Sequence, residues 1–98
     1  LIKRSLAISK LTQGAFDITF SGLSELYSFD KAEYNMPTEE QLAVTLKNVG
    51  YQHIEMLDNN RVFINREKVK MGFGAIGKGY AANKTKQLLQ SEGVENGV

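Results

Sequence analysis

Apolar side chains recur at helical spacing over residues 1–12. One apolar strip combines Leu1, Ile8 and Leu11, and a second strip adds Ile2 and Leu6. Apolar positions three, four and seven residues apart lie on one face of a helix, so this segment predicts a helix packed on a core. Gln13-Gly14 follows directly, and glycine is typical of the position just after a helix end.

Two later segments are also predicted to be helices. Thr38 followed by Gln41 is the pattern of a capping box, which predicts a helix start, and Gly50 is expected to end that helix. Its apolar stripe consists of Leu42, Leu46 and Val49. A last helix is predicted over residues 76–91, with Gly93 at its end. Small residues near its start would let a neighbouring element approach closely. A short helical turn is also expected over residues 23–27.

Residues 15–20 alternate between apolar and polar side chains. Phe16, Ile18 and Phe20 share one parity, which predicts a short strand. Asp17 would then be an exposed strand acid or, in the alternative, an acid aimed at a ligand.

Residues 51–70 have the pattern of a β-hairpin. Apolar residues alternate on both sides of Asp58-Asn59-Asn60, and these turn residues tolerate positive φ. Residues 94–98 are expected to begin another strand. The order of elements predicts an α+β fold in which helices pack on a mainly antiparallel sheet.

The length of the chain limits the number of domains it can form. The 98 residues suit one small domain or a piece of a larger one. Leu1 is not an initiator methionine, and Val98 follows a glycine at an expected strand start. We therefore interpret residues 1–98 as a central fragment of a longer domain, truncated at both ends.

Several kinds of chemistry are disfavoured. A net charge of +1 without a basic stripe argues against nucleic acid as a partner. The chain has no cysteine, which excludes disulfides, thiolate zinc sites and cysteine nucleophiles. His53 is the single histidine, so a metal cluster built around it is not expected. No apolar run reaches the roughly 18 residues that a membrane span needs.

The stretch over residues 71–80 is rich in glycine and precedes the last predicted helix. Such a turn at a helix start exposes unpaired N–H groups and a partial positive charge, which suits a phosphate. The alternative is that the glycines permit helix and sheet to cross closely. Residues 72–77 also fit G-x-G-x-x-G, but a hairpin precedes them. The nearly matching P-loop pattern has Gly79 where a Ser or Thr should hold Mg²⁺.

Three segments in register resemble the ApbE family. Residues 13–19 (QGAFDIT) resemble its G-A-F-D-x-T signature, and residues 48–54 (NVGYQHI) resemble its V-G-Y-x-x-I segment. Residues 74–82 (GAIGKGYAA) resemble its G-x-I-(A/G)-K-G-Y-A helix start, and a G-V-E-N turn follows at residues 93–96. Three short signatures in the same order are more specific than any one of them.

The resemblance implies an FAD:protein FMN transferase, a class once described as thiamine biosynthesis lipoproteins. Such an enzyme has a T-fold-like α+β fold, binds FAD and Mg²⁺, and transfers FMN to a threonine hydroxyl of a target protein with release of AMP. The implied acceptor is a flavin-carrying subunit of a redox-driven ion pump. The implied location is extracytoplasmic, periplasmic or on the outer face of the cell membrane, through a lipid anchor outside these residues.

Site residues are carried over from the same resemblance. Ala15, Phe16 and Asp17 would contact FAD, Lys78 would lie at the flavin dinucleotide, and Ala75 would offer a backbone carbonyl to the metal. No catalytic residue is assigned. Many members have an acid where Gly72 stands, and the remaining metal ligands would lie beyond Val98. The fragment alone is therefore expected to be inactive, and the alternatives are a non-enzymatic flavin-binding relative or a purely structural domain.

Overall fold

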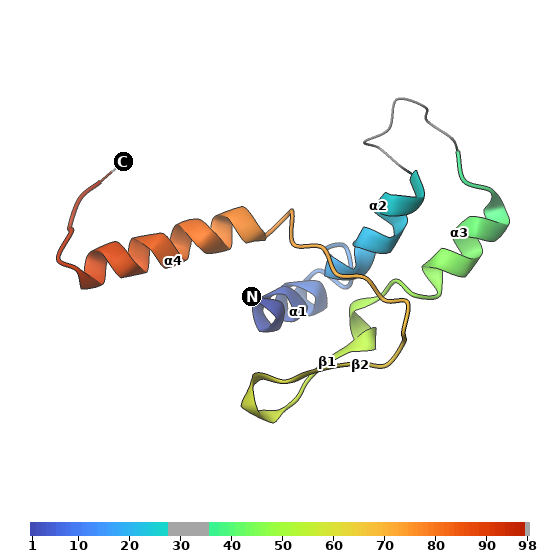
Figure 1. The fold of residues 1–98 in the computed structure, drawn as a ribbon, viewed down its shortest axis with the longest axis horizontal. Helices are drawn as coiled ribbons and strands as arrows, with labels where there is room; N and C mark the ends of the chain where they lie inside the picture. Colours follow the sequence, from blue (N-terminus) through green and yellow to red (C-terminus); the bar gives the residue numbers. More distant parts are fainter. Residues whose placement is uncertain (28–35, 98) are drawn as a thin grey trace.

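The computed structural model describes residues 1–27 and 36–97, and within these ranges the chain combines α-helices with an antiparallel hairpin (Figure 1). The helices are α1 (Ile2–Leu11), α2 (Ser21–Tyr27), α3 (Glu39–Leu46) and α4 (Gly77–Ser91), and the strands are β1 (Ile54–Met56) and β2 (Val62–Ile64). Single-turn 3₁₀ helices occur at η1 (Ile18–Phe20) and η2 (Tyr51–His53), whereas η3 (Asp58–Asn60) is a turn with non-helical φ and ψ at Asn59. The predicted α+β class with antiparallel strands is confirmed.

The core lies where α1, η1 and β1 meet. Leu6, Ile18 and Ile54 are buried against one another, one from each of these elements. Burial of each such side chain contributes about 1.5–3 kcal/mol. The partly buried apolar residues packed around them are Ile2, Phe16, Tyr51, Met56, Val62, Val69, Met71 and Phe73. This core joins α1 to the hairpin and to the glycine-rich stretch.

Helix α1 confirms the predicted element, but only one of the two predicted apolar strips faces the core. Ile2 and Leu6 do so, whereas Leu11 is 83% exposed, so its assignment to a core face was wrong. Ser5 and Ser9 are fully buried beside Leu6. Their hydroxyls donate hydrogen bonds one turn back, to the Leu1 and Ser5 carbonyls, at 3.2 and 3.0 Å. Small polar residues can pack there because their hydroxyls are satisfied within the helix.

The predicted hairpin is confirmed. Ile54 pairs with Ile64 and Met56 with Val62 across the two strands. Asn59 and Asn60 both have φ of 58°, which is the left-handed conformation that asparagine tolerates.

The capping box at the start of α3 is also confirmed. Thr38 Oγ1 accepts a hydrogen bond from the Gln41 N–H at 3.2 Å, and the Thr38 N–H donates to Gln41 Oε1 at 2.9 Å. The helix ends at Leu46, however, so Val49 does not belong to its apolar stripe and Gly50 is not its end. Helix α3 packs against α2, the short helix predicted near residues 23–27.

The strand predicted over residues 15–20 is wrong. Asp17 is extended, with φ of −146°, but residues 18–20 form η1 and lead directly into α2. The Asp17 carboxylate caps η1 by accepting the Thr19 N–H at 2.8 Å. A side chain that captures a nearby backbone N–H offers the chain an alternative to a strand ladder. Asp17 is therefore not an exposed strand acid.

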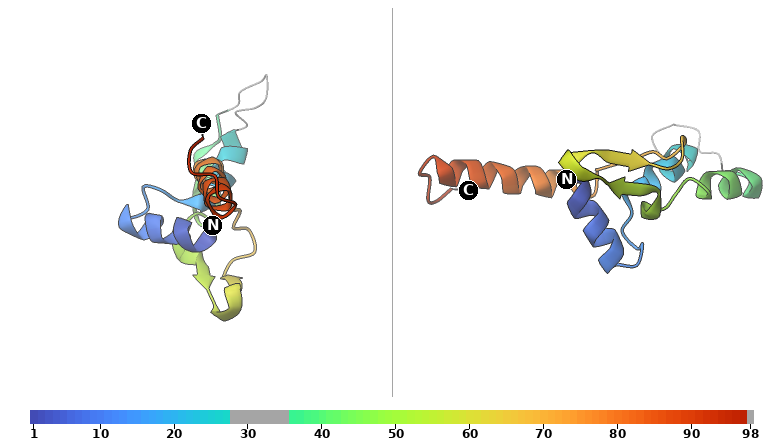
Figure 2. Two further views of the ribbon diagram at one scale, coloured as in Figure 1. Left: turned by 90° about the vertical axis from the view of Figure 1, so that its left-hand side faces the viewer. Right: turned by 90° about the horizontal axis from the view of Figure 1, so that it is seen from below.

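Helix α4 extends away from the rest of the described chain (Figures 1 and 2). It spans the predicted residues and ends as predicted before Gly93, which has φ of 85°. None of its residues is buried, and a Cβ added at Gly79 would meet no atom within 4 Å. Among the described residues, no close neighbour is found at Gly79, whereas a Cβ at Gly77 would make an ordinary contact of 3.8 Å with Phe73 Cβ. Residues 94–97 form no strand, and Val98 lies outside the described residues.

Candidate cofactor site

Three segments that are distant in the sequence form one pocket of about 480 Å³. The first segment leads into η1, the second precedes η2, and the third belongs to the glycine-rich stretch. The lining residues are Gly14, Ala15, Phe16, Asp17, Ile18, Phe20, Val49, Gly50, Gly72 and Ala75. The pocket thus brings together four of the five predicted site residues: Ala15, Phe16, Asp17 and Ala75.

Asp17 connects the first two segments. Its Oδ1 accepts hydrogen bonds from the Thr19 N–H at 2.8 Å and from the Thr19 hydroxyl at 2.7 Å. Its Oδ2 accepts the Tyr51 N–H at 2.7 Å, across 34 positions of sequence. A carboxylate has about four lone-pair sites, so most of its accepting capacity is already used within the chain.

Thr19 completes the connection, and sequence reasoning gave it no separate role. It is fully buried, and its hydroxyl oxygen accepts the Gly50 N–H at 2.6 Å. The Asp-x-Thr spacing could have indicated a local cap. Nothing in the sequence indicates the bond to Gly50, because the two residues are 31 positions apart.

The glycine-rich stretch is joined to η1 by its backbone. The Gly72 N–H donates to the Ile18 carbonyl at 2.7 Å. A Cβ at Gly72 would lie 3.1 Å from Ser21 Cβ and 3.3 Å from Ser21 Oγ, so this glycine permits a close approach to α2. Packing therefore accounts for Gly72, whereas a Cβ at Gly74 would meet no atom within 4 Å.

A tight turn follows Gly72 and leads into α4. The Phe73 carbonyl accepts the Ile76 and Gly77 N–H groups, at 3.1 and 2.6 Å. None of the backbone hydrogen bonds of this turn ends on the Ala75 carbonyl. No side chain caps the start of α4. Unpaired amides and the dipole at a helix start of this kind favour negative charge.

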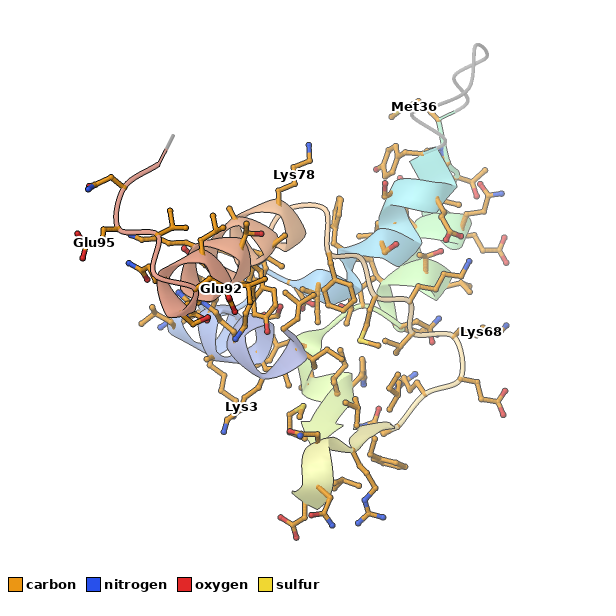
Figure 3. All side chains as sticks on the ribbon, turned by 60° about the vertical axis from the view of Figure 1, so that its left-hand side comes forward. Lys3, Met36, Lys68, Lys78, Glu92 and Glu95 are labelled. Carbon is orange, nitrogen blue, oxygen red and sulfur yellow. The ribbon has the colours of Figure 1, made fainter. Side chains whose placement is uncertain are left out.

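Lys78 lies in the first turn of α4 but does not line the pocket. Figure 3 shows its side chain pointing away from the body of the molecule, and the residue is exposed. The structure thus places Lys78 within three residues of Ala75 without bringing its side chain to the other predicted residues.

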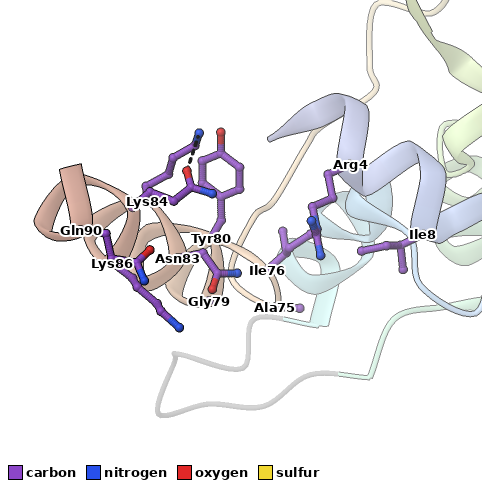
Figure 4. A pocket seen from close by; sticks show the side chains of 11 residues that line it. Arg4, Ile8, Ala75, Ile76, Gly79, Tyr80, Asn83, Lys84, Lys86 and Gln90 are labelled. Carbon is purple, nitrogen blue, oxygen red and sulfur yellow. Dashed lines mark hydrogen bonds between the residues drawn. The ribbon is translucent and has the colours of Figure 1, made fainter. Parts of the chain in front are cut away.

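A second cavity, of about 690 Å³, lies between α1 and α4 (Figure 4). Arg4 and Ile8 line it from α1, and Tyr80 and Lys84 are among the residues that line it from α4. Lys84 Nζ donates to Gln87 Oε1 at 3.2 Å and lies 5.8 Å from the centre of the Tyr80 ring. Ala75 lines both cavities, so they meet at the turn before α4.

Side chains that commonly bind metals do not cluster in the described residues. Over residues 1–27 and 36–97, no three His, Cys, Asp or Glu side chains gather as a metal site would require. The Ala75 carbonyl is nevertheless an oxygen donor of the kind that Mg²⁺ prefers, and the turn leaves it without a hydrogen bond. A single backbone carbonyl is compatible with a metal site only where further ligands come from outside the described residues.

All of residues 1–98 match the ApbE family. This chain belongs to the ApbE family. It is 30% identical to the FAD:protein FMN transferase of Buchnera aphidicola subsp. Schizaphis graminum over 98% of its length, and 28% identical to that of Salmonella typhimurium over 96%. The ApbE-family chain spans 30% and 28% of the length of these two relatives.

Solved ApbE structures share its fold. The flavin transferase ApbE from Vibrio cholerae matches 97% of this chain with a TM-score of 0.85 at 28% identity, and the chain covers 31% of that structure. The ApbE protein from Thermotoga maritima matches 92% with a TM-score of 0.79 at 36% identity, and 30% of it is covered. Over residues 1–27 and 36–97, this ApbE chain contains no helix with the length and hydrophobicity of a membrane span.

Proposed function

We propose that this ApbE-family chain forms part of the cofactor site of an Mg²⁺-dependent FAD:protein FMN transferase. The observation that carries the proposal is the family match over residues 1–98, in which the A-F-D signature and Ala75 line one pocket. A threonine hydroxyl of the acceptor protein attacks the phosphorus of the FMN half of FAD. The bond to the bridging oxygen breaks, AMP leaves with that oxygen, and the hydroxyl proton passes to a base.

The residues of this chain serve mainly to bind and orient the cofactor. Ala15, Phe16 and Asp17 line the pocket from the segment that leads into η1, and Gly72 and Ala75 line it from the glycine-rich stretch. The uncapped start of α4 offers N–H groups to the diphosphate, and Lys78 adds a positive charge nearby. Phosphoryl transfer depends on such positioning and on neutralised charge.

Magnesium would be held in part by the Ala75 carbonyl, and when bound it would withdraw charge from the phosphate oxygens. Its remaining ligands are proposed to come from the diphosphate and from residues outside this chain. For this reason we propose that residues 1–98 alone do not catalyse the transfer. The further proposals are an acceptor that is a flavin-carrying subunit of a redox-driven ion pump, and an extracytoplasmic, lipid-anchored full-length protein.

A flavinylation assay tests the activity. The full-length protein that contains this segment is incubated with FAD, Mg²⁺ and an acceptor protein, and covalent flavin and AMP are both quantified. We expect equal amounts of the two products, loss of both with EDTA, and no product from residues 1–98 alone. FAD binding without AMP release would instead support a non-enzymatic flavin-binding relative. Turnover by the 98 residues alone would contradict the proposed dependence on further ligands.

A further inference from the structure

The three walls of the pocket are held together at η1 and the residue before it. The Ile18 carbonyl accepts the Gly72 N–H, the Thr19 hydroxyl accepts the Gly50 N–H, and Asp17 Oδ2 accepts the Tyr51 N–H. These three bonds measure 2.7, 2.6 and 2.7 Å. Both of the other walls are therefore attached to the Asp17–Thr19 segment.

We propose that Thr19 is a positioning residue for the flavin dinucleotide, an inference that rests on the proposed function. Thr19 itself does not line the pocket, but its neighbours Asp17, Ile18 and Phe20 do, as does its partner Gly50. Through these residues, the Thr19 side chain fixes the distance between the segment that leads into η1 and the Val49–Gly50 segment.

The hydroxyl, rather than the volume of the side chain, performs this role. Thr19 is fully buried, and its hydroxyl donates to Asp17 Oδ1 while its oxygen accepts from Gly50, so its single proton and its acceptor capacity both have a defined use. Without the oxygen, the Gly50 N–H would lose its partner in a buried position, which is unfavourable. The Val49–Gly50 wall would then move or admit water, and either change alters the pocket.

Two substitutions separate the hydroxyl from the shape of the side chain. Thr19→Val keeps the size and branching but removes the oxygen, whereas Thr19→Ser keeps the oxygen and removes one methyl group. Each variant is made in the full-length protein. The dissociation constant for FAD is measured by flavin fluorescence at a temperature where circular dichroism shows the variant to be folded, and kcat and KM for FAD are measured in the flavinylation assay.

We expect Thr19→Val to raise both the FAD dissociation constant and the KM for FAD at least tenfold, with a much smaller change in kcat. Thr19→Ser should remain within about threefold of the wild type, because it keeps the hydroxyl that makes both hydrogen bonds. A folded Thr19→Val protein that binds FAD like the wild type would show a role in stability only and would overturn the proposal. Equal losses in the two variants would also overturn it.

If Thr19→Val does not fold, Thr19→Ala provides the same comparison, because it places no apolar branch against the Gly50 N–H. Failure of both variants to fold at any temperature would assign Thr19 to stability and reject the positioning role. A wild-type protein that binds no FAD would instead contradict the proposed function itself, so the two failures are distinguishable.

Discussion

Gly72 has two neighbours that define what can replace it. Its N–H is bonded to Ile18, and a Cβ would lie 3.1 Å from Ser21 Cβ. We expect Gly72→Ala to lower the free energy of unfolding by about 1–3 kcal/mol, the usual range for overpacking. Urea denaturation measures this value. In a Ser21→Gly background the alanine should cost much less, because the contacting atoms are gone. An equal cost in both backgrounds would show that Ser21 is not the obstacle.

Lys78 is tested against a lysine on another face of the same helix. Lys78 is exposed and does not line the pocket, so a contact with the diphosphate requires its side chain to turn when FAD binds. With that contact, Lys78→Ala should raise the FAD dissociation constant of the full-length protein about 10- to 100-fold, which corresponds to a hydrogen bond to a charged group of roughly 1.5–3 kcal/mol. Lys84→Ala is the matched control, since Lys84 Nζ is already bonded to Gln87. It should change the constant by less than about threefold. Similar effects in both variants would indicate a general field of the helix rather than a contact from Lys78.

Asp17 and Thr19 show which part of the site the sequence could predict. The A-F-D signature indicated a segment that lines one pocket together with Ala75. The sequence could not predict that Asp17 uses both carboxylate oxygens within the chain, because Tyr51 lies 34 positions away. Whether Asp17 also contacts FAD stays a prediction. Side-chain bonds to a distant backbone leave no periodic signal, so Thr19 was missed.

At the level of elements, the start of α3 allows a direct test of local stability. Thr38→Ala removes the acceptor for the Gln41 N–H and should lower the free energy of unfolding by about 1 kcal/mol. Thr38→Ser keeps the hydroxyl and should stay within a few tenths of a kcal/mol of the wild type. Urea denaturation of the three proteins provides the comparison. A Thr38→Ala protein as stable as the wild type would mean that solvent satisfies the helix start equally well.

Elements that were predicted from caps and turn residues are confirmed. The element that was predicted only from alternating apolar and polar residues, at residues 15–20, is wrong. The capping box of α3 and the asparagine turn of the hairpin both appear as expected, because their signals depend on neighbours within three residues. Residues 15–20 have the alternation of a strand, yet Phe20 is 53% exposed and begins no ladder. The Asp17 cap outweighs a period-two pattern of only three apolar positions.

The whole molecule is longer than its residue count suggests. Its radius of gyration is 17.1 Å and its extents are 55 × 38 × 22 Å, whereas a compact domain of this size would have a radius near 13 Å. Helix α4 accounts for much of the longest dimension (Figures 1 and 2). Leu88 and Leu89 on this helix are 61% and 46% exposed. The sequence predicted α4 itself but could not show that its apolar residues lack cover within the described chain.

This arrangement predicts different stabilities for α4 and α1 in the isolated 98 residues. A 15-residue helix with no buried residue is only marginally stable in water, because nucleation is costly and no buried face offsets it. Amide hydrogen exchange should therefore be fast along α4. It should be much slower in α1, where Ser5, Leu6 and Ser9 are buried.

The same measurement on the full-length protein completes the test. The relatives are more than three times as long as this chain, since the chain covers about 30% of them. We expect the rest of the longer protein to cover the apolar side of α4 and to slow exchange there by at least tenfold, with little change in α1. Because the proposed anion site lies at the start of α4, that covering would also hold Lys78 and the free amides in place. Equal exchange of α4 in the short and long proteins would show that the helix remains uncovered and would argue against a fixed anion site at its start.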